Sequence, residues 1–244
     1  STIDFPIRVA GTPTWGASCL ASDNVTFLNG GKFYADSTSI YNFASLDMES
    51  GSVFGHAINT VSTSTPDKAL NIAVSGNFTM KEGSTVDVSG KGNASQRGPF
   101  KGQNAFSGSP PPNYGGGGGG HGGQGGGVAA IANIVNTGAG VRGLMSDDDL
   151  NNPQEIGSAG GASSDYWTGP GNGSEKTGSE GGGIFIANIA GTFDFEGSIK
   201  ADGNNGNARA FSGGGGGAGG SINIVTNNLI GAYGTMTSKG GGST

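Results

Sequence analysis

Residues 184–203 read IFIANIAGTFDFEGSIKADG, and this stretch decides the fold class. It divides into three short apolar runs, which are separated at Gly191 and Gly197. Such runs with small residues between them are typical of short β-strands joined by tight corners. One unit of this kind cannot bury its apolar face alone, so the pattern predicts that several units stack around a shared core.

The same pattern recurs on both sides of this stretch. An earlier copy reads LNIAVSGNFTMKEGSTVDVSG (residues 70–90), and a later copy reads INIVTNNLIGAYGTMTSKG (residues 222–240). A degenerate copy, MESGSV, lies at residues 48–53, and no 3.6-residue period is sustained between residues 23 and 90. We therefore predict an all-β fold, either a β-solenoid of the parallel β-helix kind or a β-sandwich, with long glycine-rich loops.

Glycine is heavily over-represented, with 53 of 244 residues against a usual share of ~7%. The longest runs lie at residues 115–127 and 213–220. Two alternatives follow. The runs are flexible loops, because glycine loses the most backbone entropy on ordering, or they pack side by side as extended segments resembling polyproline II. A collagen helix is excluded because no strict three-residue glycine period is present.

The order of a strand, Gly-Ser-Ile (197–199), a polar insert and then GGGGGAGGSINI (213–224) resembles the glycine-rich repeats of very large surface proteins of microbes, protists and plants. The resemblance covers about residues 69–127 and 181–244, and it implies a β-solenoid of the adhesin type. We expect residues 1–22 to form an N-terminal strand and linker. Residues 23–244 would form a glycine-rich β domain with a divergent insert at about 128–180.

Charge and hydropathy exclude two classes of partner. The net charge is −6, and the 12 Lys and Arg residues are scattered singly, so we expect no nucleic-acid binding. No apolar run approaches the ~18 residues of a membrane span, so we expect no membrane insertion.

Reactive groups are scarce. The chain has two histidines and one cysteine, and we find no catalytic motif, so we predict no catalytic residues, no cofactor and no enzymatic activity. Asp147–Asp149 with Asn151, Asn152 and Glu155 could offer oxygen ligands to Ca²⁺. Their spacing is not that of an EF-hand, and we prefer a solvated acidic loop to a metal site.

The N-terminal segment alternates apolar side chains at Ile3, Phe5, Ile7 and Val9, which is the period of a β-strand. This strand could join the first sheet of its own chain. Alternatively, it is an assembly strand that pairs with a neighbouring subunit and so builds a filament.

Two further sets of residues are candidates for surface contacts. Four Asn-x-Ser/Thr sequons, about the number expected by chance, make glycosylation a candidate at Asn24, Asn77, Asn93 and Asn172. Exposed aromatic side chains could meet sugars or an assembly partner, or could instead cover the ends of the sheet; these are Tyr114, Tyr166 and Trp167.

Together these features predict an extracellular or cell-surface structural protein. We expect it to be a subunit or repeat of a surface fibre, assembled from copies of itself by β-strand addition or end-to-end stacking. The alternative is an adhesin or carbohydrate-binding module of a larger cell-surface protein, with glycans as its partners.

Overall fold

The computed structural model describes residues 2–4, 7–10, 24–105, 115–121, 143, 148–149, 151–163, 178–207, 213–231 and 233–242. These residues contain fourteen β-strands. They include no helix long and apolar enough to cross a membrane. The described residues contain no helix of any kind, so the predicted all-β class is confirmed.

The strands form five successive groups, which we call tiers. An N-terminal pair, β1 (Thr2–Asp4) and β2 (Ile7–Ala10), precedes them. The tiers are β3 (Asn24–Phe27) and β4 (Lys32–Ala35); β5 (Ile40–Phe43), β6 (Ser45–Met48) and β7 (Val53–His56); β8 (Leu70–Val74), β9 (Phe78–Met80) and β10 (Thr85–Asp87); β11 (Ile184–Phe195) and β12 (Ser198–Lys200); and β13 (Ser221–Ile230) and β14 (Thr235–Thr237).

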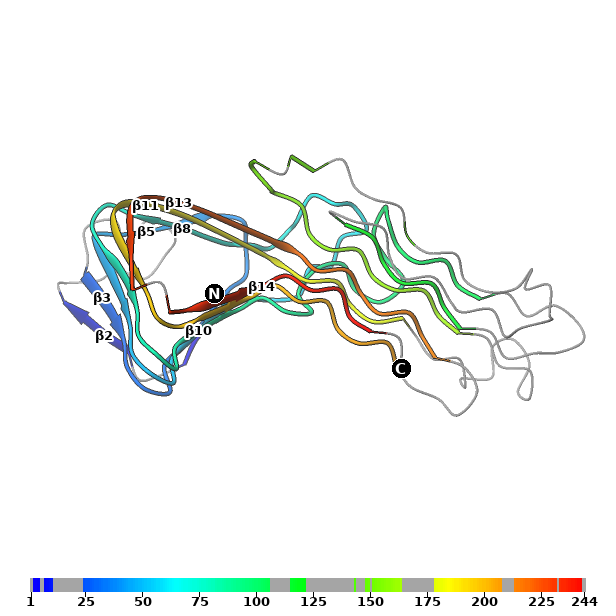
Figure 1. The fold of residues 1–244 in the computed structure, drawn as a ribbon, viewed down its shortest axis with the longest axis horizontal. Coiled ribbons are helices and arrows are strands. Elements are labelled where there is room, and N and C mark those ends of the chain that lie inside the picture. The colour runs from blue at the N-terminus through cyan, green and yellow to red at the C-terminus, as the bar shows by residue number, and fades with distance from the viewer. Residues whose placement is uncertain are drawn as a thin grey trace, which may run out of the picture.

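Strands of successive tiers pair in parallel, and they enclose one core between two sheets. One sheet has the order β1-β4-β7-β10-β12-β14. The other has the order β2-β3-β6-β9-β11-β8-β5, with β13 on β11. Because β11 pairs with both β8 and β9, the second sheet bends around the core, and Figure 1 shows the strands enclosing it on three sides.

The register places equivalent apolar residues in rows that run through the tiers. One row is Val25, Leu46, Phe78, Phe193 and Leu229, and another is Phe33, Phe54, Val86, Ile199 and Met236. Every second side chain of a strand points inward, so the rows fill the core. The Phe78 and Phe193 rings stack with centroids 5.0 Å apart.

The chain leaves the tiers repeatedly at one place. It departs after β7, after β10 and after β12, and each time it returns at the start of the next tier, at β8, β11 and β13. The long excursions after β10 and β12 run side by side away from the strands, as the extended traces in Figure 1 show. We give the name glycine bundle to the described segments of these two excursions, together with the residues after β14 that pair with them: residues 92–105, 115–121, 156–163, 178–183, 203–207, 213–220 and 240–242.

Backbone hydrogen bonds between different segments hold the glycine bundle together. The N–H groups of Gly157 and Gly160 donate to the carbonyls of Gly182 and Ser179, both at 2.9 Å. Donors three residues apart thus reach one neighbouring segment. The same spacing recurs from Ser179 and Gly182 to Gly215 and Ala218.

This three-residue spacing matches the three residues per turn of polyproline II, which has no internal hydrogen bonds. Each turn therefore presents its donors and acceptors to neighbours on several sides. Of the two alternatives for the glycine runs, ordered packing is confirmed for the described segments.

Candidate functional site

The last tier leaves inward-facing apolar side chains uncovered. Leu229 and Met236 are 51% and 45% exposed, whereas Phe193 and Ile199, which precede them in the same rows, are fully buried. Within the described residues no further strand lies beyond β13 and β14. An apolar surface of this kind, made of core positions, favours contact with another protein surface.

The backbone at the same end is also unpaired along one edge. Among the described strands, β13 pairs only with β11 and β14 only with β12. Their outer edges therefore present free N–H and C=O groups beside the exposed apolar side chains. Such an edge is a template for strand addition.

The N-terminal segment forms two strands instead of the single strand that its alternation predicts. β1 pairs antiparallel with β4, with Ile3 opposite Phe33. β2 pairs antiparallel with β3, with Ile7 and Val9 opposite Phe27 and Val25. The two short strands thus lie on separate sheets of their own chain, which is the first of the two alternatives for this segment. Phe5 lies outside the described residues, and a role in assembly stays a prediction.

The sequons fall in different environments. Asn24 and Asn77 are exposed. Asn93 is fully buried, and its Nδ2 donates to the carbonyls of Val61 and Thr63 at 3.1 and 2.9 Å. A glycan would attach to that same atom, so we remove Asn93 from the candidates. Asn172 lies outside the described residues, as do the candidate contact residues Tyr114, Tyr166 and Trp167.

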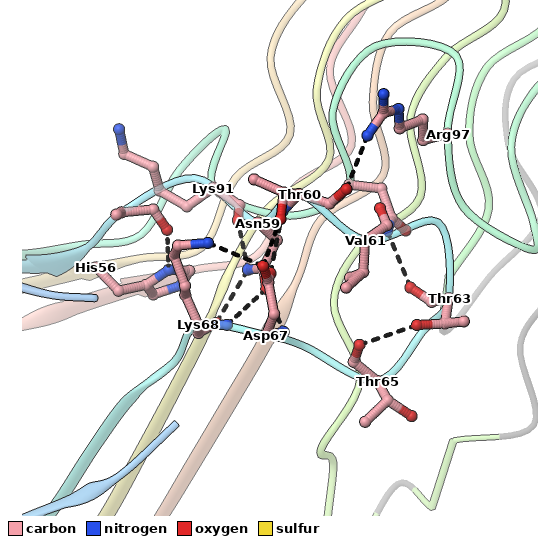
Figure 2. A network of polar contacts seen from close by, with 12 residues as sticks. His56, Asn59, Thr60, Val61, Thr63, Thr65, Asp67, Lys68, Lys91 and Arg97 are labelled. Carbon is pink, nitrogen blue, oxygen red and sulfur yellow. Dashed lines mark hydrogen bonds and ion pairs between the residues drawn. The ribbon is translucent and has the colours of Figure 1, made fainter. Parts of the chain in front are cut away.

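A polar network fixes the loop between β7 and β8 (Figure 2). The Nδ2 of buried Asn59 donates to the carbonyls of Lys68 and Lys91, and its Oδ1 accepts the N–H groups of Asp67 and Lys68. Burial would raise the pKa of Asp67, but hydrogen bonds from Lys68 and Thr60 outweigh it and lower the pKa to about 2. All four bonding positions of the Asn59 amide are used, so we interpret the network as a structural clamp.

His56 is also a structural residue. Its Nδ1 donates to the carbonyl of Ala57 at 2.7 Å, and its Nε2 accepts the N–H of Ile184 at 3.1 Å. Burial lowers its pKa to about 4. Since both ring nitrogens are occupied, His56 has no lone pair left for a ligand.

A groove of about 680 Å³ lies between the acidic loop at residues 148–155 and the residues around β8 and the start of β11. Its lining includes Thr38, Thr65, Asn71, Asp148, Glu155 and Ile186. The side chain of His121 lies next to the two carboxylates, so that one potential ligand atom from each of the three residues lies within 4.8 Å of the others.

The sequence grouped Asp148 and Glu155 as candidate oxygen ligands in one acidic loop, but it did not connect His121 with them. His121 is separated from Asp148 by more than twenty residues, and it was an isolated histidine in a glycine run. The order of the glycine bundle places them side by side, and a repeat pattern carries no signal for that order.

Comparisons with known proteins found no match to a family model, to a curated protein or to a solved structure.

Proposed function

We propose that the tiers form a β-solenoid and that the chain is a structural unit of an extracellular fibre, joined end to end with further copies of itself. The observation that carries the proposal is the half-exposed pair of core side chains, Leu229 and Met236, beside unpaired strand edges. Covering these side chains removes apolar surface from water, at ~25 cal/mol per Å².

The occupant we favour is the N-terminal end of a second copy. The sheet that ends in β14 begins with β1, and the sheet that carries β13 begins with β2. Placing β1 and β2 of one copy on β14 and β13 of another would therefore continue both sheets. The contact is head-to-tail, and a contact of this type that does not close builds a filament.

Negative-stain electron microscopy of the wild-type chain tests the proposal, together with a double variant carrying Leu229→Lys and Met236→Lys. Two lysines at the exposed end would place unpaired charges in the contact, so we expect wild-type filaments and a monomeric variant. The control is Asn188→Lys, which adds a charge to the exposed outer side of the fourth tier and should keep the filaments.

Wild-type protein that remains monomeric at high concentration would contradict end-to-end assembly. Screening the same monomeric protein on a glycan array then tests the adhesin alternative. Filaments that persist in the double variant would contradict the proposed contact surface.

A further inference from the structure

Three chemically suitable side chains converge at the junction of the glycine bundle with the tiers. His121 lies in the segment 115–121 of the bundle, and Glu155 immediately precedes the segment 156–163. His121 Nε2 lies 3.5 Å from Oδ2 of Asp148, and the side chains of these two residues are 10% and 9% exposed. The three residues thus offer one nitrogen and two carboxylate groups in a largely buried place.

The His121 ring is oriented as a metal-binding imidazole usually is. It hydrogen-bonds to the backbone carbonyl of Gly219, and its Nε2 faces Oδ2 of Asp148 across 3.5 Å, which is longer than an ordinary hydrogen bond. The bond to Gly219 must therefore come from Nδ1, which donates. In the neutral ring this leaves the lone pair on Nε2, directed at the carboxylates.

A second buried atom at the same place also has no partner. Oε2 of Glu155 makes no hydrogen bond, and burying such an oxygen without a partner is costly. Among the described residues, no N–H or O–H group donates to this oxygen. A cation bound between these groups would satisfy both the oxygen and the lone pair.

Outer contacts hold the carboxylates in position. Asp148 accepts the N–H groups of Gln154 and Glu155 at 3.1 and 3.3 Å, and Ser221 donates to the carbonyl of Glu155 at 2.6 Å. Bonds of this kind orient the carboxylates that bind metal ions.

We propose that His121, Asp148 and Glu155 bind one divalent transition-metal ion of the Zn²⁺ type. A mixed set of imidazole and carboxylate ligands suits Zn²⁺, whereas Ca²⁺ and Mg²⁺ take oxygen ligands. Asp148 and Glu155 also line the groove, so the groove leads a further ligand, such as water, to the ion. The site is independent of end-to-end assembly.

Two measurements on the metal-stripped wild-type chain test the site. Isothermal titration with Zn²⁺ should show one bound ion per chain, and the melting temperature should rise because the ion binds the folded state. The chain has two histidines, so ¹⁵N spectra of the imidazoles report each one separately. Zn²⁺ should shift Nε2 of His121 and leave His56 unchanged, because both nitrogens of His56 already have partners.

Variants complete the test. His121→Ala and Glu155→Gln should each weaken Zn²⁺ binding at least about tenfold, because even the loss of a residue that only orients a ligand costs about that much. Asp149→Asn, at an exposed neighbouring position, should bind Zn²⁺ as the wild type does. The proposal is overturned if the wild type does not bind Zn²⁺, or if Zn²⁺ leaves the His121 signal unchanged. The spectra of the wild type decide the matter even if a variant fails to fold.

Discussion

At the scale of single residues, two buried polar side chains connect distant parts of the chain. His56 links the end of β7 to the start of β11 through Ile184, and Asn59 ties its loop to Lys91. Neither role was predictable, because the partners of both side chains are backbone groups that the fold brings close. The alternating apolar positions, in contrast, were predictable, because they depend only on the two-residue period of a strand.

The buried His56 predicts a loss of stability in mild acid. Its pKa is about 4 in the folded chain and close to 6.5 when unfolded, so the unfolded chain binds more protons between these values. The contribution of neutral His56 to the free energy of unfolding is fully present above about pH 6.5. It is lost as the pH falls towards 4, and the loss is on the order of 3 kcal/mol. Urea unfolding at several pH values, with an NMR titration of His56, measures this. A His56 that titrates near 6.5 would contradict it.

The Asn59 clamp predicts a sharp effect of a small substitution. Asn59→Asp replaces the donating Nδ2 with an oxygen, so two donated bonds are lost and a charge is placed at a fully buried position. We expect a loss of about 2–4 kcal/mol in the free energy of unfolding. The matched control is Asn188→Asp at an exposed position, which should stay within ~0.5 kcal/mol of the wild type. Equal effects of the two changes would argue against the clamp.

At the scale of elements, the glycine bundle depends on the absence of side chains. A Cβ at Gly160 would lie 1.9 Å from the carbonyl oxygen of Gly215, and a Cβ at Gly215 would lie 1.9 Å from that of Gly117. The glycine runs are visible in the sequence, but flexible loops and closely packed segments have the same glycine-rich composition. Only the partners of each N–H distinguish them, and those partners lie far apart in the chain.

Alanine in the bundle should therefore be destabilising wherever backbones are in contact. We expect Gly160→Ala to cost about 1–3 kcal/mol, because backbone atoms would have to move apart. The control is Gly240→Ala, because a Cβ at this position would lie 3.7 Å from its nearest neighbouring atom. This substitution should change the free energy of unfolding by less than ~0.5 kcal/mol. Thermal unfolding and amide hydrogen exchange measure both variants. Similar protection of the bundle amides in the two variants would contradict the close packing.

At the scale of the whole molecule, the repeat predicted the tiers more completely than it predicted the ends or the excursions. The copies at residues 70–90, 184–203 and 222–240 contain the strands of the last three tiers. The N-terminal segment instead divides between two sheets, because period-two alternation does not tell which sheet each half joins. The cluster of His121 with two carboxylates arises only when the excursions pack together.

The tier in which a core side chain lies should determine how much it contributes to the free energy of unfolding. Phe193→Ala, in the fourth tier, should cost about 3–5 kcal/mol because it leaves a cavity. Leu229→Ala, in the same row of the half-exposed last tier, should cost about 1 kcal/mol in the monomer.

The same comparison also tests assembly. The cost of Leu229→Ala should increase in filaments, because their contact would bury this side chain. Urea unfolding of monomers and filaments measures the difference, and an equal cost in the two states would contradict burial at the contact.

The common departure point of the excursions has an evolutionary consequence. Insertions after β7, β10 or β12 leave every strand pairing of the tiers intact. The chain can therefore become longer at this departure point without any change to the hydrophobic core. Within the bundle, however, partners recur every third residue. Insertions and deletions there should therefore persist mainly in multiples of three residues, and they should be matched in the neighbouring segments.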